Sequence, residues 1–272
     1  MKKAKIKRKT MRRRRSTRRR MLGGNQEQAA APPKKTVVLY TFHEYNDRVG
    51  HFIKHAIFED SNVDFVVICC NPTLEFECPP YVKKIMRENK GFDFGAWSDT
   101  LLLHGYDKGY ENYIFANSST KGPYLRPDFK GKWTDVYING LTGNVKLFGS
   151  TISTIKSPKE HSHVQSYIYA MKKDTLDYLI QRGIFSKTDY AKTMDDAIWK
   201  KEVAMSRYII EKGWNIGSLL PLYKDVDFTF STPQDEEKLK KYGDIMTPAG
   251  HNNKLWNEYD LVFIKGNRGF HI

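Results

Sequence analysis

Two continuous apolar segments flank an amphipathic one near the start of the chain. Residues 36–41 (TVVLYT) and 65–70 (FVVICC) are apolar throughout, as strands buried on both faces are. Between them, apolar residues recur at spacings of three and four over 49–57, and Asn46 or Asp47 is suited to cap that helix. This strand–helix–strand order predicts an α/β fold with a mostly parallel central sheet, covered by helices. The loop after the first strand then lies at the carboxyl edge, where such folds bind ligands.

The positive charge of the chain is concentrated at its N-terminus. The formal net charge is +14, but residues 1–20 contain thirteen Lys and Arg and no acid, so the remainder is nearly neutral. We therefore expect residues 1–34 to form a disordered basic arm and linker, and 35–272 to form one domain. The arm suits an anionic membrane surface or nucleic acid, a nuclear address, or only a solvated tail. It has no aromatic residue for stacking on bases.

Cysteine usage and hydropathy indicate the compartment. Cys69, Cys70 and Cys78 are too few and too close together for a disulfide framework, and they lack a paired Cys/His spacing for zinc. No apolar run approaches the ~20 residues that cross a bilayer. The arginines at 18–20 precede a polar segment rather than the apolar part of an export signal. We expect a cytoplasmic protein, at most peripheral to a membrane.

The segment 88–99 (ENKGFDFGAWSD) contains the most distinctive local pattern. Gly91 and Gly95 lie on either side of Asp93, between a strand-like run and a helical one. Glycine has no Cβ, so a strand–loop–helix corner of this kind can approach a ligand closely, and amides at the helix start suit a diphosphate. A tight turn without a ligand explains the same glycines. The spacing is not the dinucleotide-binding fingerprint, because no third glycine follows at the required place.

The pattern Asn89-x-Gly91-x-Asp93-x-Gly95-Ala96-Trp97 resembles the rhamnan-synthesis-F type of glycosyltransferase and its relatives in algae and large viruses. Three later segments fit that family in the same order, namely 115–123 (FANSSTKGP), 163–166 (HVQS) and 258–268 (EYDLVFIKGNR). The resemblance covers most of residues 36–268. It implies a GT-A fold, a Rossmann-type α/β sandwich that binds nucleoside diphosphates. It also implies transfer from a nucleotide sugar to a glycan or glycoconjugate acceptor.

The resemblance also implies a donor site. The diphosphate would lie across Asn89 and the Gly91–Gly95 corner and against the turn at Asn117, Ser118 and Ser119. GT-A enzymes usually carry an Asp-x-Asp motif at that turn, whose carboxylates hold a divalent cation.

An amide and two hydroxyls occupy the turn here, and Ser118 stands where relatives often have aspartate. Dependence on Mn²⁺ or Mg²⁺ is therefore open. Either Asp93 supplies the missing charge, with Asn117 and His251 as further candidate ligands, or basic side chains neutralise the diphosphate.

Candidate acceptor-side residues follow. His163 and Gln165 share one face of a strand predicted over 163–171, and the resemblance assigns that face to the substrate; a polar strand edge is the alternative. Trp97 is expected to line the site as well. We expect short strands or loops over 133–148 to shape the acceptor side.

The clearest helix is predicted over 193–213, with Thr193 and Asp196 forming a near capping box. At 100° per residue, Glu202 falls within an apolar stripe. A carboxylate on a buried face is costly unless it is paired or used. The larger inverting GT-A families carry their base at a comparable position, so the resemblance makes Glu202 the general base. An ion pair of Glu202 with Arg207 or Lys265 is the alternative.

Two other acidic residues and two cationic residues complete the set of candidate site residues. Asp195 and Asp196 are rivals to Glu202, but stabilisation of the helix dipole already explains acids in a first turn. Lys265 and Arg268 suit the charge of a leaving nucleoside diphosphate if the C-terminal segment folds back over the site.

The sequence therefore predicts a GT-A-like glycosyltransferase. Its alternatives are a catalytically silent nucleotide-sugar-binding relative and a nucleic-acid-binding protein that acts through the arm.

Overall fold

A seven-stranded sheet forms the centre of the computed structural model, which describes residues 35–269. The predicted arm at 1–34 lies outside the described residues. The strand order is β10-β6-β9-β4-β1-β2-β3. All neighbours are parallel except β9, which runs antiparallel to β4 and β6. The strands are β1 (Thr36–Phe42), β2 (Val63–Cys69), β3 (Lys83–Met86), β4 (Asn112–Asn117), β6 (Val145–Gly149), β9 (Ile168–Lys172) and β10 (Asn215–Ser218).

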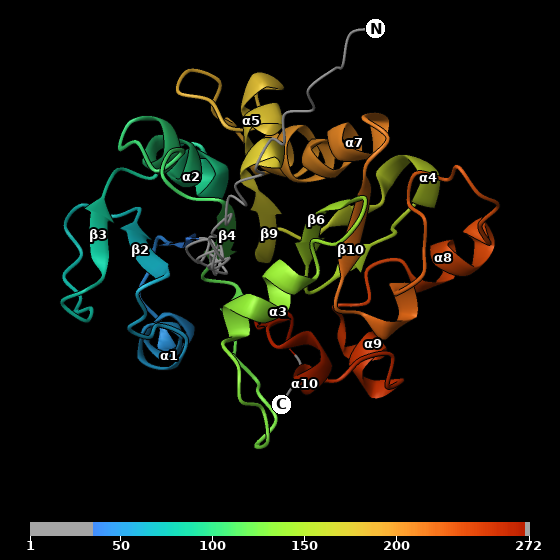
Figure 1. Cartoon of the computed structure of the whole chain (residues 1–272), viewed down its shortest axis with the longest axis horizontal. Coiled ribbons are helices and arrows are strands. Elements are labelled where there is room, and N and C mark those ends of the chain that lie inside the picture. The colour runs from blue at the N-terminus through green and yellow to red at the C-terminus, as the bar shows by residue number, and fades with distance from the viewer. Residues whose placement is uncertain (1–34, 270–272) are drawn as a thin grey trace, which may run out of the picture. The chain divides into compact units, whose positions relative to one another are not determined.

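Helices cover both faces of this sheet, which confirms the predicted α/β sandwich with a mostly parallel sheet. One face carries α2 (Phe92–Leu102), α5 (Lys173–Gln181) and α7 (Ala204–Glu211), and the other carries α1 (Asp47–His55) and α3 (Trp133–Asn139) (Figure 1). Alternate side chains of β1 enter two separate cores. Leu39 packs with the first group of helices, and Tyr40 stacks on Phe52 of α1. The absence of polar alternation in β1 is thus explained by burial on both sides.

Local signals located several elements correctly. Asn46 caps α1, its side-chain oxygen accepting hydrogen bonds from the Arg48 and Val49 amides at 3.0 and 3.3 Å. The three cysteines are free thiols. Within residues 35–269, none of the helices has the length and apolar character needed to span a bilayer.

Two regions differ from the prediction. Residues 163–171 form two strands, β8 (His163–Val164) and β9, which belong to different sheets. A turn at 166–167 separates them, and the Ser166 amide in that turn donates to Glu202. Residues 133–148, where we expected short strands or loops, begin with the helix α3 and end, as expected, in a loop and the short strand β6. Trp133 and Tyr137 lie one helical turn apart and are both buried, which is the signal that the prediction overlooked.

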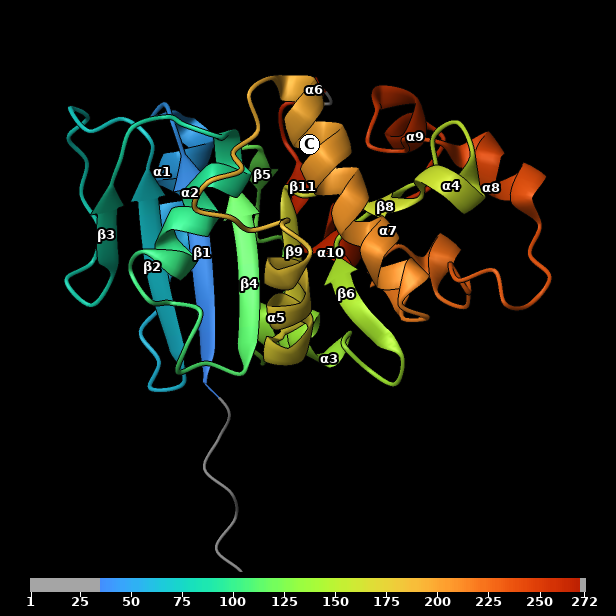
Figure 2. The same ribbon diagram turned by 90° about the horizontal axis from the view of Figure 1, so that it is seen from above.

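Short elements complete the chain around the carboxyl edge and the β10 side of the sheet. Figure 2 shows α6 and the pair β5–β11 at the edge where β1, β2 and β4 end. The elements are β5 (Thr120–Lys121), β7 (Ile152–Ser153), α4 (Pro158–His161), α6 (Met194–Asp196), the π-helix η1 (Ala197–Val203), the 3₁₀-helix η2 (Pro221–Tyr223), α8 (Glu236–Tyr242), α9 (Pro248–Asn252), α10 (Glu258–Leu261) and β11 (Ile264–Lys265).

The two glycines of the 88–99 corner are required by packing of the chain itself. Gly91 has φ of 79° and caps α2, and a Cβ there would lie 2.8 Å from the Tyr190 ring. A Cβ on Gly95 would lie 2.0 Å from the Lys90 carbonyl oxygen. These clashes explain both glycines without a ligand, which is the tight-turn alternative.

Candidate active site

A cavity of about 580 Å³ opens at the carboxyl edge of the sheet. It joins residues from β4, the start of α2, the π-helix η1 and the C-terminal segment. Asp93, Asn117 and Glu202, which are far apart in the sequence, line this one cavity. The other predicted site residues in its lining are Asn89, Ser119, His163, Gln165, Lys265 and Arg268.

Asn117 connects the end of β4 to the start of α2. Its side-chain nitrogen donates a hydrogen bond of 2.8 Å to Asp93 Oδ2, and its side-chain oxygen accepts one of 2.9 Å from the Ser119 amide. A backbone N–H can only donate, so the second bond fixes which end of the amide faces Asp93. The Asn117 side chain therefore holds the carboxylate of Asp93 and the turn after β4 in one arrangement.

The Asp93 carboxyl is the most strongly perturbed acid in the cavity. Burial raises its pKa to about 6, although the hydrogen bond from Asn117 opposes that rise. The nearby Glu202 carboxyl contributes to the raised pKa, and the Lys265 ammonium opposes it; the value of about 6 is the net result. Two carboxyl groups and one cation therefore influence one another across the cavity, which is typical of functional sites.

Glu202 belongs to η1, a stretch of π-helix between α6 and α7. Its Oε1 accepts a hydrogen bond of 2.6 Å from the Ser166 amide, and the residue is 9% exposed. One turn further on, Ser206 Oγ accepts a bond of 3.0 Å from the Val164 amide. The helix thus supplies acceptors to one amide of β8 and to one of the turn between β8 and β9.

The π-helix changes the basis on which Glu202 was singled out. The projection at 100° per residue assumes an α-helix throughout 193–213, but Ala197–Val203 is π-helical. Thr193 does cap the segment, accepting a bond from the Asp196 amide. Insertions of π-helix are rare and occur frequently at functional sites. Glu202 is inward-facing as predicted, although the regular helix used to predict it is not present.

Arg207 is not the ion-pair partner of Glu202. Its guanidinium donates to the Lys159 carbonyl oxygen at 2.7 Å. The buried cation of this helix is Lys201, whose ammonium donates to the carbonyl oxygens of Gly183 and Asp189. Lys201 therefore fixes the segment that precedes α6.

The C-terminal segment folds back to the cavity, as the prediction required. The strand β11 pairs antiparallel with β5, and the Gly266 amide donates to the Ser119 carbonyl oxygen at 2.7 Å. These bonds bring Lys265 to the lining. Arg268 donates to Asp244 Oδ2 at 3.1 Å, and the other oxygen of Asp244 accepts from Gln165 at 3.2 Å.

Several predicted site residues lie outside this cavity. The prediction that Trp97 lines the site is wrong, because its side chain is fully buried in the core and its Nε1 donates to the Leu39 carbonyl oxygen. Gly95 is not in the lining, and Gly91 borders a neighbouring cavity instead. The lining also omits Ser118 and His251. The Ser118 carbonyl accepts from Arg48, and His251 lines a separate cavity with Trp256.

Several residues that line the cavity were not predicted individually from the sequence. His43 follows β1 in the loop that was expected to lie at the ligand edge, but its position in that loop had no further signal. Asp244 lies in a charged region with no motif. Ile155, Lys156 and Trp199 also line the cavity, and single apolar or basic residues in loops and helix ends give no periodic pattern.

Two of the residues proposed as metal ligands, Asn117 and His251, are not arranged to share a metal ion with Asp93. Asn117 turns the nitrogen of its amide, which carries hydrogens, toward Asp93 and engages its oxygen with Ser119. His251 is in a different cavity. In the part of the chain from 35 to 269, no cluster of three or more His, Cys, Asp or Glu side chains is arranged to hold a metal.

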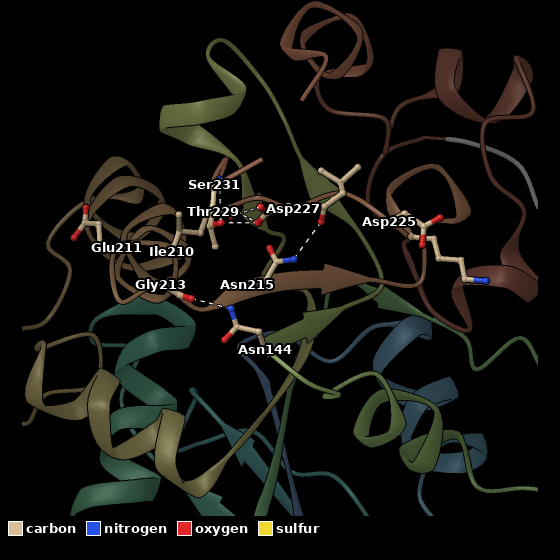
Figure 3. Close-up of a pocket in the computed structure, with 11 residues that line it drawn as sticks. Asn144, Ile210, Glu211, Gly213, Asn215, Asp225, Asp227, Thr229 and Ser231 are labelled. Carbon is tan, nitrogen blue, oxygen red and sulfur yellow. Dashed lines mark hydrogen bonds between the residues drawn. The ribbon is translucent and has the colours of Figure 1, made fainter. Parts of the chain in front are cut away.

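A second cavity, of about 690 Å³, lies beside β10 and is a weaker candidate (Figure 3). Its carboxylate Asp227 accepts hydrogen bonds of 2.6 Å from the hydroxyls of Thr229 and Ser231. Burial raises the pKa of Asp227, but these bonds outweigh it and hold the pKa at about 2. Asn215 and Asn144 likewise bond to backbone carbonyls of Val226 and Gly213. These polar groups stabilise turns of the chain.

The raised pKa of Asp93 predicts a specific pH dependence of stability. Its folded-state pKa of about 6 exceeds the ordinary value of 3.8, so the folded chain binds the proton more tightly and loses stability as pH rises from 4 to 6. Relative to Asp93→Asn, the wild type should lose up to about 3 kcal/mol across this range. Urea unfolding of both proteins at pH 4 to 7 measures the difference.

Asp196→Asn is the matched control for this experiment. The hydrogen bond from Lys200 lowers the pKa of Asp196, so the wild type should gain stability relative to this control as pH rises. Parallel profiles for wild type and Asp93→Asn would contradict the burial of an ionisable Asp93.

A family model matches the part of the chain that contributes many of the residues lining the cavity. The model of the family described as rhamnan synthesis protein F matches residues 78–234, more than half of the chain. The matched region contains Asp93, Asn117 and Glu202. No curated protein matches the chain. The chain therefore belongs to the rhamnan synthesis protein F family, whose description connects it with polysaccharide synthesis.

Proposed function

We propose that the chain is a glycosyltransferase that moves a sugar from a nucleotide-diphosphate sugar to an acceptor hydroxyl in polysaccharide synthesis. The observation that carries the proposal is the shared cavity. Two carboxyl groups, Asp93 and Glu202, line it together with the cations Lys265 and Arg268, at the sheet edge where α/β folds bind ligands. The membership in the rhamnan synthesis protein F family supports the same substrate class.

The cationic side of the cavity suits the donor diphosphate. Lys265 and Arg268 reach the cavity on the segment that is bonded to the turn after β4, so both cations lie near Ser119. In this proposal the diphosphate lies between Ser119 and the two cations, which neutralise the charge that grows as the sugar–phosphate bond breaks. Arg268 exchanges its bond with Asp244 for one with the diphosphate.

The poor fit of Asn117 to a metal makes these cations the main counter-charge in the proposal. A divalent ion needs oxygen ligands, preferably charged ones. Asn117 instead turns its amide nitrogen toward the Asp93 carboxylate and donates a hydrogen bond to it. We therefore propose that transfer does not require Mn²⁺ or Mg²⁺.

Glu202 is the proposed general base. The Ser166 amide holds one carboxylate oxygen and thereby orients the group at the cavity wall. Glu202 takes the proton of the acceptor hydroxyl as its oxygen forms a bond to the anomeric carbon. The bond from that carbon to the donor phosphate breaks, and its electron pair leaves with the nucleoside diphosphate. A single displacement of this kind inverts the anomeric configuration.

Asp93 is assigned a different role. It is bonded to Asn117 and lies at the start of α2, close to the turn that is proposed to hold the diphosphate. We assign it to hydrogen bonds with hydroxyls of the donor sugar. Its pKa of about 6 also makes it the rival base, so the two variants must be compared.

A silent nucleotide-sugar-binding protein is the second candidate. It is favoured by Ser118, a hydroxyl at the position where the resemblance leads us to expect an aspartate. Such a protein would bind the donor without turnover.

Glu202→Gln should reduce sugar transfer by about 10²–10⁴-fold, because the acceptor hydroxyl loses its base. Donor binding should be retained, since the amide group is similar in size. The measurement is nucleoside-diphosphate release from a panel of dTDP-, UDP- and GDP-sugars, with the anomeric configuration of the product read by NMR.

Glu211→Gln is the control, because Glu211 lies at the exposed end of α7 and faces Arg182. Full activity of Glu202→Gln, with loss of activity in Asp93→Asn alone, would transfer the role of base to Asp93. Donor binding without release by the wild type would establish the silent candidate.

Lys265→Ala and Arg268→Ala should each weaken nucleoside-diphosphate binding by roughly tenfold or more, because each removes a charge-assisted contact. Lys212→Ala, which removes a cation beside Trp214 and away from the cavity, should leave binding unchanged. Calorimetric titration with dTDP, UDP and GDP measures these affinities.

Transfer should persist in EDTA, whereas its loss in EDTA and recovery with Mn²⁺ would contradict the metal-free proposal.

A further inference from the structure

One rim of the cavity carries large apolar side chains that are exposed. Ile155, Met194 and Trp199 all line the cavity and are 42%, 60% and 39% exposed. They come from two segments, the loop between β7 and α4 and the α6–η1 helix. Exposed apolar groups that gather at the mouth of a polar cavity commonly mark a binding surface.

The ring of Trp199 is held in position by its neighbours. The His161 ring meets it edge to face, with centroids 5.4 Å apart and an angle of 76° between the planes. The ammonium of Lys156 lies 4.7 Å from the centroid of the indole. Lys156 has φ of 65°, a conformation that residues other than glycine rarely adopt. Residues in such rarely populated backbone conformations are found preferentially at functional sites.

Polar groups lie beside this apolar rim. Ser153, His163 and Gln165 line the same cavity, and Glu202 adjoins them. His163 Nδ1 lies 2.7 Å from the His161 carbonyl oxygen, which can only accept. The neutral ring therefore carries its hydrogen on Nδ1, and Nε2 is left as an acceptor for a hydroxyl. Gln165 is already bonded within the protein, with its amide oxygen accepting from Thr151 and its amide nitrogen donating to Asp244. The cavity thus combines a rigid apolar rim with the free Nε2 acceptor of His163 and the carboxylate of Glu202.

We propose that this rim, formed by Ile155, Met194 and Trp199, is the acceptor subsite and that together with His163 of the same cavity it binds a pyranose ring of a glycan. The inference rests on the proposed transferase function and specifies its acceptor class. The apolar C–H face of the sugar packs on Trp199, and its hydroxyl edge bonds to the polar groups. This orientation directs an acceptor hydroxyl toward Glu202.

The composition of the rim favours a sugar over a lipid chain. A pyranose ring has one apolar face and a polar edge, and the apolar side chains of the rim are bordered directly by polar ones. A lipid chain needs a continuous apolar groove, whereas Asp93, Glu202 and Lys265 line the same cavity as the apolar rim. The ammonium of Lys156 on the indole is likewise poorly suited to an alkyl chain.

The test is transfer to short rhamnose, glucose and mannose oligosaccharides by wild type, Trp199→Ala and Trp199→Phe. Trp199→Ala should raise the KM for the acceptor by about three- to tenfold, through loss of the stacking surface. Trp199→Phe should recover most of this loss.

Tyr81→Ala is the matched control, because Tyr81 is 41% exposed and does not line the cavity. Oligosaccharide binding is also followed by tryptophan fluorescence without donor, where Trp199→Phe should abolish the signal. Unchanged acceptor KM in Trp199→Ala, or binding of a polyprenyl phosphate in place of every oligosaccharide, would overturn the acceptor subsite. Failure of the proposed function would be seen separately, as absence of any stabilisation by nucleotide sugars.

Discussion

The hydrogen bonds of Asn117 determine the geometry on which the candidate site depends. This side chain stands at the end of β4 and bonds to Asp93 at the start of α2 and to the Ser119 amide. It therefore ties a central strand, a helix start and the turn that receives the C-terminal segment. The Gly266 amide in turn bonds to the Ser119 carbonyl, so Lys265 reaches the cavity through the same turn. Asn117 thereby fixes Asp93 relative to the Ser119 turn and, through that turn, to the segment that carries Lys265.

The second fixed point is Glu202 in its π-helix. A buried carboxylate is stabilised when it accepts a backbone hydrogen bond, and the Ser166 amide supplies one. Ser166 lies in the turn that separates β8 from β9. One hydrogen bond thus connects the π-helix η1 with the turn between β8 and β9. Both elements lie at the cavity, in agreement with the expectation that strained or irregular elements gather at functional sites.

The sequence was informative where one physical signal dominated. The unbroken apolar runs of β1 and β2 predicted the parallel sheet, and Asn46 marked the start of α1. The shared position of Asp93, Asn117 and Glu202 came from a family resemblance combined with the burial of a carboxylate. The role of Trp97 could not be read, because the same residue type serves a core and a binding site. Gly91 and Gly95 were ambiguous for a similar reason, since close packing and ligand contact both require glycine.

Long-range contacts explain most of what the sequence did not indicate. Asp244 enters the cavity through its bonds to Gln165 and Arg268, residues 79 and 24 positions away. Trp199 and Lys156 meet at the rim across more than forty residues, and no periodic pattern connects them. The rim that is proposed to bind the acceptor is therefore assembled by tertiary structure alone.

The central claim is that this cavity receives a sugar-linked diphosphate with its anomeric carbon facing Glu202. A crystal structure of the chain with the nucleotide sugar that stabilises it most measures this directly. The diphosphate should lie between Ser119 and the cations Lys265 and Arg268, with the sugar against Asp93. A donor bound beside Asp227 in the second cavity, or one whose anomeric carbon faces away from Glu202, would contradict the account.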